Sequence, residues 1–277
     1  MVRDSNVVKY QEYVKPPVKV GDIAYWDGNS VKTVPLSNWN TGLGTPVGVV
    51  MIGENFLPDS KVRIISLTSM NDGELLQWNE PGESVNNSSV LKFKKVPTTD
   101  NASSANTDNS DYGGYLPSDI FTWKQSYVDP LTKYFVLTPM IPSPYLGDKF
   151  NPTYATELSD GNALSDFNGL TNTQLLVNEG EQYHAAHACW NYKDSASSNL
   201  QWYLPTIGEL GLLMVRFQLI NTSIQTVGGT PIGMEDILWS STMYSKEQAY
   251  YLHIETGNVW GEVYTEGKFP VRSCSCL

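Results

Sequence analysis

Short apolar runs separated by turn residues make up the first part of the chain. Residues 23–26 and 31–34 flank an Asp27-Gly28 pair, which is typical of a tight turn between two strands. Two further runs, residues 46–52 and 61–67, flank a loop with Pro58 and Asp59. We therefore predict consecutive β-hairpins that form a small β-rich module over residues 1–82.

Two segments of the second half have apolar residues at helical spacing. The first begins at Thr171 with a capping box and runs to Trp190. The second begins after Thr206, which forms a capping box with Glu209, and reaches Phe217. Both segments predict amphipathic helices that pack on a sheet.

The last forty residues contain short β-type runs with bulky polar and aromatic residues at alternate positions. The runs are Leu238–Thr242, Ala249–Ile254, Gly257–Tyr264 and Phe269–Ser273. Residues alternate between the two faces of a strand, so Val259 and Val263 would face the core while Trp260, Glu262 and Tyr264 point outward. Two helices followed by an antiparallel sheet predict an α+β fold.

The composition agrees with a β-rich protein that has a recognition surface. The chain has 277 residues with 12% aromatic and 17% charged residues, including 16 Tyr and 8 Trp. Tyr and Trp provide large, stiff contact areas, although β-rich proteins use aromatic residues in any case. The net charge of -11 disfavours a nucleic-acid partner.

Two further sequence features bear on where the protein is located and on which of its residues form a flexible loop. There is no apolar run of the roughly 18 residues that span a bilayer, and the start of the chain lacks the apolar segment of a signal peptide. We therefore expect a protein made in a bacterial cytoplasm that does not insert into membranes. Residues 98–111 have no large apolar side chain, which predicts a flexible polar loop.

One short segment has the residue types of a metal site. Glu181, His184 and His187 are spaced by three, and Cys189 lies nearby. A helix would place the first three on adjacent faces, which could start a metal site. No second cluster of histidines or carboxylates occurs in the sequence, so we expect ordinary packing, no bound metal and no cofactor.

The three cysteines, Cys189, Cys274 and Cys276, are too few and too scattered for a disulfide framework. We interpret Cys274 and Cys276 as part of a frayed tail with reduced thiols. Neither a Gly-x-Ser-x-Gly elbow nor a phosphate-binding Gly-rich motif occurs. We expect a binding protein and not an enzyme.

Several motifs of the second half carry a resemblance to a known fold. They are Leu164–Gly169, Ala186–Tyr192, Trp202–Leu210, Trp239–Thr242 and Val271-Arg272. In this order they resemble the C-type-lectin fold in its bacterial and phage form, which includes formylglycine-generating-enzyme-like domains and variable proteins diversified by retroelements. The resemblance covers about residues 85–277 and implies a C-type-lectin-like ligand-binding domain at residues 83–277, with two helices and an antiparallel sheet.

The resemblance also implies where a ligand would bind. Variable proteins of this type have their hypervariable residues between the Trp-Ser-Ser-Thr motif and the terminal Val-Arg. The candidate ligand-binding residues at those positions are Tyr244, Lys246, Glu247, Gln248, Tyr250, His253, Trp260, Glu262 and Tyr264. The tripeptides of calcium-dependent lectins do not occur, which disfavours a calcium lectin but leaves calcium-free glycan binding open.

A second resemblance concerns the first module. Gly21–Gly28, Leu36–Val50 and Arg63–Leu67 look like segments in structural proteins of crAss-like phages of gut Bacteroidales, including head-fibre-type proteins. This likeness implies a virion protein, head fibre or similar appendage, attached to other capsid proteins through residues 1–82. The C-terminal domain would then bind a host cell-surface protein or glycan, and multivalent display would favour a homo-oligomer, for which we expect a trimer.

Three alternatives stay open at this point. A bacterial surface adhesin of the same fold would need a processed N-terminus. A formylglycine-generating-type oxidase would need its cysteine pair in an active site, whereas Cys274 and Cys276 lie beyond the terminal Val271-Arg272. A capsid decoration without a receptor would not need the outward residues at all.

Overall fold

The computed structural model describes residues 17–54, 56–57, 59–80, 123–128, 135–139, 166–193, 195–243, 248–255, 259–263 and 267–277. Only the backbone is described for 123–128, 135–139, 215, 248 and 259–263. The expected polar loop at 98–111 lies outside the described residues.

The predicted N-terminal hairpins are confirmed. Strand β1 (Ile23–Trp26) pairs antiparallel with β2 (Val31–Val34), and Ile23 lies opposite Val34. The Asp27 carboxylate accepts hydrogen bonds from the backbone N–H groups of Asn29 and Ser30, both at 2.8 Å. Gly28 has a φ of 97°, a left-handed conformation that glycine adopts without steric cost. Local turn chemistry therefore determines this hairpin.

Strand β3 (Thr45–Ile52) lies at the centre of this part of the structure. It pairs antiparallel with β1 on one side and with β4 (Arg63–Ser66) on the other. Residues 47–52 are buried without interruption, so both faces of the strand are covered. Three short 3-10 helices complete this region: η1 (Leu36–Asn38), η2 (Thr41–Leu43) and η3 (Asn71–Gly73).

The main sheet combines strands from the two ends of the chain. Strands β11 (Cys274–Cys276) and β7 (Trp202–Tyr203) extend it to six strands in the order β2-β1-β3-β4-β11-β7. Cys274 pairs with Ile65 in β4 and with Tyr203 in β7. The expectation of a frayed C-terminal tail is wrong, because β11 is an interior strand that is hydrogen-bonded on both sides.

The two expected modules share this sheet and also a core. One cluster of buried apolar residues contains Ile23, Val49 and Ile65 together with Leu210 and Ile220. The expected boundary between residues 82 and 83 therefore does not separate two cores. The described residues of the two halves pack on each other as one body.

The first predicted helix is two helices. Helix α4 (Gly169–Glu179) begins two residues before Thr171, and α5 (His184–Trp190) follows after a break at Gly180. Gly180 has an extended backbone, with φ 162° and ψ 167°, and its N–H donates to the Leu176 carbonyl at 3.3 Å. The expected single helix from Thr171 to Trp190 is wrong because the glycine leaves the helical conformation.

The second predicted helix is confirmed at its start. Helix α6 (Ile207–Val215) has the predicted capping box, in which the Thr206 hydroxyl accepts from Glu209 N and the Glu209 carboxylate accepts from Thr206 N. The helix ends at Arg216, and a further helix, α7 (Phe217–Thr226), follows. Phe217 therefore belongs to α7 and not to the predicted helix.

A second sheet contains the terminal β-runs. Strands β8 (Ile237–Met243), β9 (Gln248–His253) and β10 (Val259–Val263) form an antiparallel sheet in the order β10-β9-β8. The fourth run does not join it: Phe269 forms a single bridge to Leu76. Strands β5 (Trp123–Val128) and β6 (Phe135–Pro139) form a separate two-stranded sheet.

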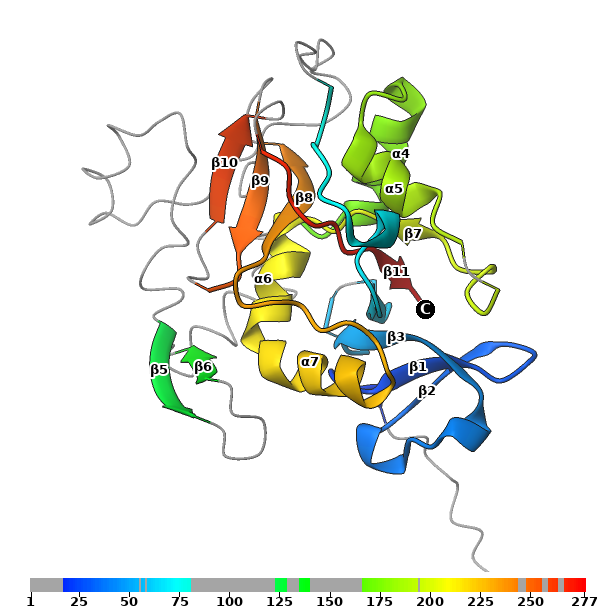
Figure 1. Cartoon of the computed structure of the whole chain (residues 1–277). Helices are drawn as coiled ribbons and strands as arrows, with labels where there is room; N and C mark the ends of the chain where they lie inside the picture. Colours follow the sequence, from blue (N-terminus) through cyan, green and yellow to red (C-terminus); the bar gives the residue numbers. More distant parts are fainter. Residues whose placement is uncertain are drawn as a thin grey trace, which may run out of the picture.

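Helix α6 links the two larger sheets, since it contacts β3 as well as β8 and β9. Figure 1 shows α6 and α7 between the strands β8 to β10 and the strands β1 to β3. The four α-helices of the described residues, together with antiparallel sheets, make the coarse class α+β, as the sequence predicts. Within the described residues, no helix is both long and apolar enough to cross a bilayer.

Candidate functional site

The Trp-Ser-Ser-Thr segment in β8 is anchored through its tryptophan. Trp239 is fully buried, and its indole N–H donates to the Leu76 carbonyl at 2.9 Å. Its ring packs against Phe269 with the centroids 4.7 Å apart. Trp78, also buried, donates from its indole N–H to the Ser240 carbonyl at 2.7 Å. Two indole hydrogen bonds thus fix β8 against residues 76–78.

The hydroxyls of the same segment tie β8 to its neighbours. The Ser240 hydroxyl donates to the Tyr250 carbonyl in β9 at 2.8 Å. The Thr242 hydroxyl donates to the Asp166 carboxylate at 3.2 Å and accepts from the Ile207 N–H at 3.0 Å. Because Ile207 is the first residue of α6, these bonds hold the sheet and the helix in one arrangement.

Asp166 links its own segment, residues 166–172, to two others that are distant in sequence, at Thr206 and Thr242. Its carboxylate accepts from the Asn172 side-chain amide at 2.9 Å and from the Asn168 N–H at 3.3 Å, besides the Thr242 hydroxyl. Its carbonyl accepts from the Thr206 hydroxyl. Asp166 is 1% exposed, and a buried polar group of this kind needs hydrogen-bond partners. Its role is therefore to position α4, α6 and β8.

A second buried polar cluster also lies at the N-terminal end of α6, around Glu209. Glu209 accepts from the Tyr203 hydroxyl at 3.0 Å and from Arg63 Nε at 3.4 Å. Arg63 also donates from Nη2 to the Asp59 carboxylate at 2.6 Å. The cluster joins β4, β7 and α6, which come from both halves of the chain.

Burial and neighbouring charges shift the pKa values in this cluster. Burial raises the pKa of Glu209, and it raises that of Tyr203 well above the ordinary value, with the Glu209 charge adding to the effect. Burial would also raise the pKa of Asp59, but the hydrogen bonds from Arg63 and from the Lys61 N–H, together with the charges of these two residues, outweigh it and the pKa is lowered. The hydrogen bonds of Asp59, Arg63, Tyr203 and Glu209 make this cluster a structural clamp between β4, β7 and α6.

The predicted contact residue Tyr250 is not on the surface. Its side chain is fully buried in the core with Leu252 of the same strand and Ile254 just after it. The register pairs Tyr250 with Gly261, one of the positions expected to face the core. The structure therefore places this candidate ligand contact in the core and not on a binding face. His253 is half-buried, and its Nδ1 is buried with no hydrogen-bond partner among the residues that the structure describes.

The other predicted contact residues are described by backbone alone or not at all. Strand β10 is an edge of its sheet, and the register pairs Trp260 with Tyr251, Glu262 with Ala249, and Val263 with Gln248. The outward orientation of Trp260 and Glu262 stays a prediction. The remaining candidates lie outside the described residues: Tyr244, Lys246, Glu247 and Tyr264.

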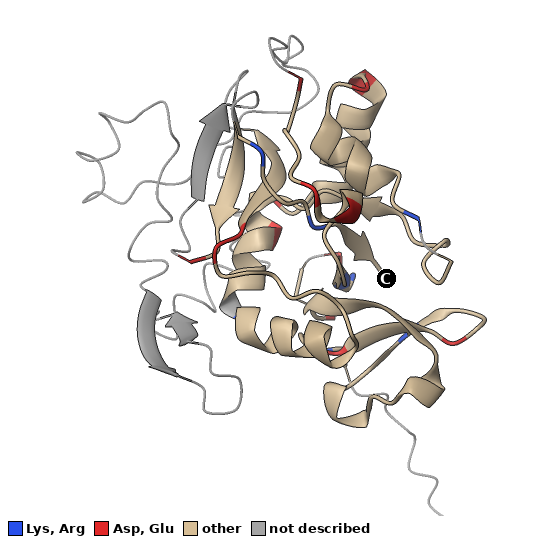
Figure 2. Cartoon of the chain, viewed as in Figure 1, with Lys and Arg blue, Asp and Glu red and all other residues tan. Residues whose placement is uncertain are grey.

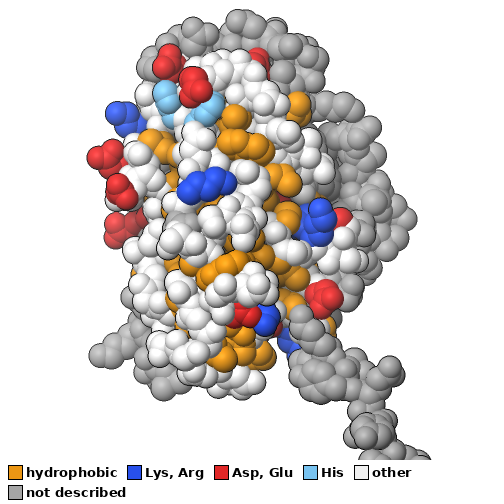
Figure 3. All heavy atoms as spheres, turned by 90° about the vertical axis from the view of Figure 1, so that its right-hand side faces the viewer, with side chains coloured by type: hydrophobic (Ala, Val, Ile, Leu, Met, Phe, Trp, Pro, Cys, Tyr) orange, Lys and Arg blue, Asp and Glu red, His pale blue; other side chains and the backbone are white. Residues whose placement is uncertain are grey.

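The histidine segment makes local contacts. His187 Nε2 lies 2.9 Å from the Gly180 carbonyl, and its Nδ1 lies 3.5 Å from the Glu181 carboxylate. His184 Nε2 lies 3.9 Å from Glu80. Figure 3 shows histidine side chains gathered with acidic ones at the upper end of the face that it views. Within the described residues no three His, Cys, Asp or Glu side chains group as metal ligands.

The cysteines lie in the interior. Cys189 and Cys274 are fully buried, while Cys276 is half-buried with its Sγ 3.9 Å from the Tyr203 hydroxyl. Burial raises the pKa of the Cys189 thiol to about 12 and raises those of Cys274 and Cys276 as well. Raised thiol pKa values keep these groups protonated and poorly nucleophilic at neutral pH.

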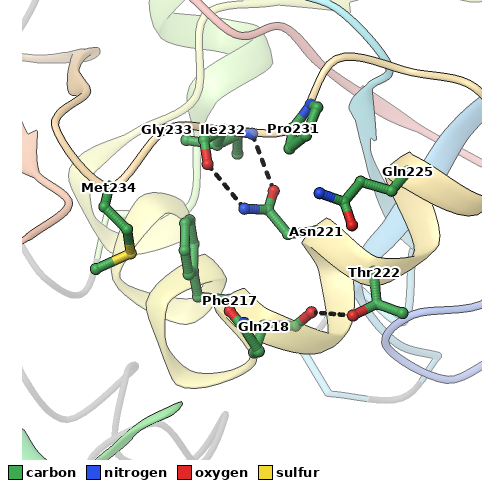
Figure 4. Close-up of a pocket in the computed structure, with 9 residues that line it drawn as sticks. All are labelled: Phe217, Gln218, Asn221, Thr222, Gln225, Pro231, Ile232, Gly233 and Met234. Atoms are coloured by element: carbon green, nitrogen blue, oxygen red, sulfur yellow. Dashed lines mark hydrogen bonds between the residues drawn. The ribbon is translucent and has the colours of Figure 1, made fainter. Parts of the chain in front are cut away.

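A small hollow lies beside α7, between the helix and residues 231–234 (Figure 4). Its volume is about 140 Å³, and Phe217 and Met234 line one end of it. The Asn221 amide accepts from the Ile232 N–H at 3.0 Å and donates to the Ile232 carbonyl at 2.8 Å. These two bonds hold the loop on the helix, so Asn221 acts as a structural link.

A larger hollow of about 410 Å³ lies on the side of η3. Residues from three separate segments line it, and all of them except Gly73 have polar side chains: Thr68, Ser69, Asn71, Asp72, Gly73, Tyr192 and Thr230. Sequence patterns do not identify this site, although Asn71-Asp72-Gly73 is a recognisable turn sequence. Figure 2 shows that the described charged residues are spread over loops and element ends, without a basic patch in that view.

No protein-family model matches the chain, and no curated protein matches it. Among solved structures, the chain is similar to a fimbrial protein from Bacteroides ovatus, with 16% sequence identity and a TM-score of 0.47. The similarity covers 94% of this chain and 49% of that one, so the chain spans about half the length of the solved structure. A likeness of this extent assigns no role to any residue.

Proposed function

We propose that the chain is a phage virion structural protein, a head fibre or similar appendage, that binds a host-surface protein or glycan through its terminal sheet. The proposal starts from the resemblance of the second half to C-type-lectin-like variable proteins and of the first module to phage structural proteins. The proposed contact residues are those of β10 and the segments around it, with Trp260, Glu262 and Tyr264 at the centre.

The anchoring of β8 is the observation that supports this proposal most. Hydrogen bonds from Trp78, Trp239, Ser240 and Thr242 fix β8 to the core, and β9 follows it with Tyr250 and Leu252 buried. Strand β10 is then the edge strand of a rigidly held sheet. A rigid scaffold lowers the entropy cost of binding for the residues that it presents.

The proposed mechanism is contact without turnover. A single site centred on three contact side chains would bind weakly. A homotrimer on a virion would raise the overall affinity through multivalency. The clamp of Arg63, Glu209 and Asp59 joins the two halves of the chain. In a virion it would hold the binding half in a constant orientation to the attachment half.

The test is binding of the purified, labelled full-length protein to a panel of gut Bacteroidales cells. The full chain is needed because β11 pairs with β4, which a fragment from residue 85 would lack. Combined Trp260→Ala, Glu262→Ala and Tyr264→Ala substitutions should weaken binding by about 100-fold or more, as expected for a central hot spot.

A matched control removes an aromatic and an acidic side chain elsewhere. Phe56 is 37% exposed and the Glu181 side chain is 93% exposed, so Phe56→Ala with Glu181→Gln should bind like the wild type. Equal binding by the triple variant and the wild type would contradict the proposed contact surface. Antibody detection of the protein on purified virions would test the location separately.

A further inference from the structure

The hollow beside η3 is formed by segments that are far apart in sequence. Residues 68–73 follow strand β4, Tyr192 follows α5, and Thr230 follows α7. Its volume of about 410 Å³ lies within the range of about 300–1,000 Å³ in which proteins bind small molecules. The hollow does not involve the terminal sheet β8 to β10.

The lining offers hydroxyl, amide and carboxylate groups together with one aromatic ring. Tyr192 is half-buried, and its ring stands edge-on to Trp202 with the centroids 5.5 Å apart. Asp72 is exposed, and within the described part of the chain no hydrogen bond or ion pair engages its carboxylate. None of the lining residues is basic, so the hollow does not favour a phosphate or another anion.

Hydrogen bonds to backbone groups hold the wall of the hollow in place. The Met70 N–H donates to the Val271 carbonyl at 2.8 Å, and the Thr68 carbonyl accepts from the Ser66 hydroxyl at 2.8 Å. The Thr230 N–H donates to the Leu67 carbonyl at 2.9 Å, while the Thr230 carbonyl accepts from Arg272. The lining side chains therefore project from fixed backbone.

The turn at residues 71–73 has an unusual conformation. Asn71 and Asp72 both have a φ of 54°, and Gly73 has a φ of 85°. Consecutive non-glycine residues in the left-handed region cost free energy, although Asn and Asp tolerate it better than other residues. Such strain persists where the surrounding structure maintains it, and it is frequent at ligand sites. Here it presents the Asn71 and Asp72 side chains at the hollow.

We infer that this hollow binds one pyranose unit, as the terminal sugar of a surface glycan. Vicinal sugar hydroxyls can donate to the Asp72 carboxylate while they accept from the Asn71 amide or the hydroxyls of Thr68 and Thr230. The apolar face of the sugar ring would lie against Tyr192. An aromatic ring together with hydrogen-bond acceptors in one lining suits an uncharged polyol.

Saturation-transfer difference NMR on the full-length protein tests this site. The probes are the methyl glycosides of α-D-mannose, β-D-glucose and β-D-galactose. At least one should bind with a Kd on the order of 1 mM. Asp72→Asn keeps a residue that tolerates the left-handed backbone but removes the charge, and Thr230→Val removes a hydroxyl at nearly constant volume. Each substitution should weaken binding by about tenfold or more.

Two controls separate this site from the terminal sheet. Glu181→Gln removes an exposed carboxylate elsewhere and should bind the sugar like the wild type. The triple alanine variant at 260, 262 and 264 should also retain sugar binding, so failure of the proposed terminal-sheet function leaves this result unaffected. The inference is overturned if none of the three glycosides binds, or if binding survives both Asp72→Asn and Thr230→Val.

Discussion

Thr242 in β8 and Asp166 before α4 are 76 positions apart in sequence and are joined by a buried hydrogen bond of 3.2 Å. The Thr242 hydroxyl also accepts from the N–H of Ile207 at the start of α6. One hydroxyl therefore connects the terminal sheet, the capping region of α6 and the segment that leads into α4. The last Thr of the Trp-Ser-Ser-Thr motif is a structural joint between these elements.

Thr242→Val should lower the free energy of unfolding by about 1–3 kcal/mol, because it leaves the Ile207 N–H unsatisfied in the interior. Urea unfolding followed by tryptophan fluorescence measures the change. Thr222→Val is the control, because Thr222 donates only to the Gln218 carbonyl on the half-exposed helix α7. Equal stability of the two variants would show that the Thr242 bonds contribute little.

Deletion of residues 274–277 should prevent folding, because it removes β11 from between β4 and β7. Deletion of Leu277 alone should be tolerated better, since this residue is 36% exposed. Circular dichroism and the yield of soluble protein report the outcome. A folded protein that lacks all four residues would restore the interpretation of a frayed tail.

Native protein should react slowly with a thiol reagent such as 5,5′-dithiobis(2-nitrobenzoic acid) at pH 8. Cys189 and Cys274 are fully buried, and a thiol with a pKa of about 12 has only about one thiolate in 10,000 at this pH. Cys276 is half-buried and should react first. All three thiols should react in denaturant. Two rapidly reacting thiols in the native state would be incompatible with the structure.

The stability of the protein should decline with rising pH through the titration of Glu209. Burial raises the pKa of this carboxyl above its ordinary value of 4.5, so the folded state holds the proton more tightly than the unfolded state. The contribution is complete below about pH 4.5 and is lost as the pH rises through the raised pKa. Glu209→Gln cannot titrate, so its unfolding free energy should fall less steeply from pH 4.5 upward. If the plots of unfolding free energy against pH are parallel for the wild type and Glu209→Gln, the raised pKa of Glu209 is contradicted.

Tyr250→Ala should reduce the unfolding free energy by about 3–5 kcal/mol, since it empties a fully buried aromatic position next to α6. Thermal unfolding measures this loss. Trp260→Ala should change the free energy of unfolding much less if Trp260 faces outward as proposed. A large loss of stability at Trp260 would instead indicate that this residue is part of the core.

Several elements could be predicted from local sequence. The β1–β2 hairpin follows from Asp27-Gly28 and its flanking apolar runs, and the start of α6 follows from the Thr206 and Glu209 capping box. The α+β class follows from the order of these elements. Gly180 could have indicated the break between α4 and α5, because glycine has a low helix propensity.

The residues of the candidate site could be predicted less well from the sequence. Alternation along the run Ala249–Ile254 places Leu252 and Ile254 on one face, and the structure confirms that both are buried, although β9 ends at His253. Tyr250 has the same parity as these two residues, yet its chemistry suggested a surface role. Aromatic residues with a polar end occur both in cores and on binding surfaces, so residue type alone does not distinguish the two locations.

The sequence by itself determined the hairpins, the capping box and the α+β class, because each of these depends on residues within a few positions of one another. Only the tertiary structure placed β11 between β4 and β7, joined Arg63 to Glu209, and brought Asp72, Tyr192 and Thr230 around one hollow. These contacts join segments that no local period relates. They form only when the two halves of the chain pack around their shared core. The sites therefore depend on tertiary packing and not on the local sequence pattern.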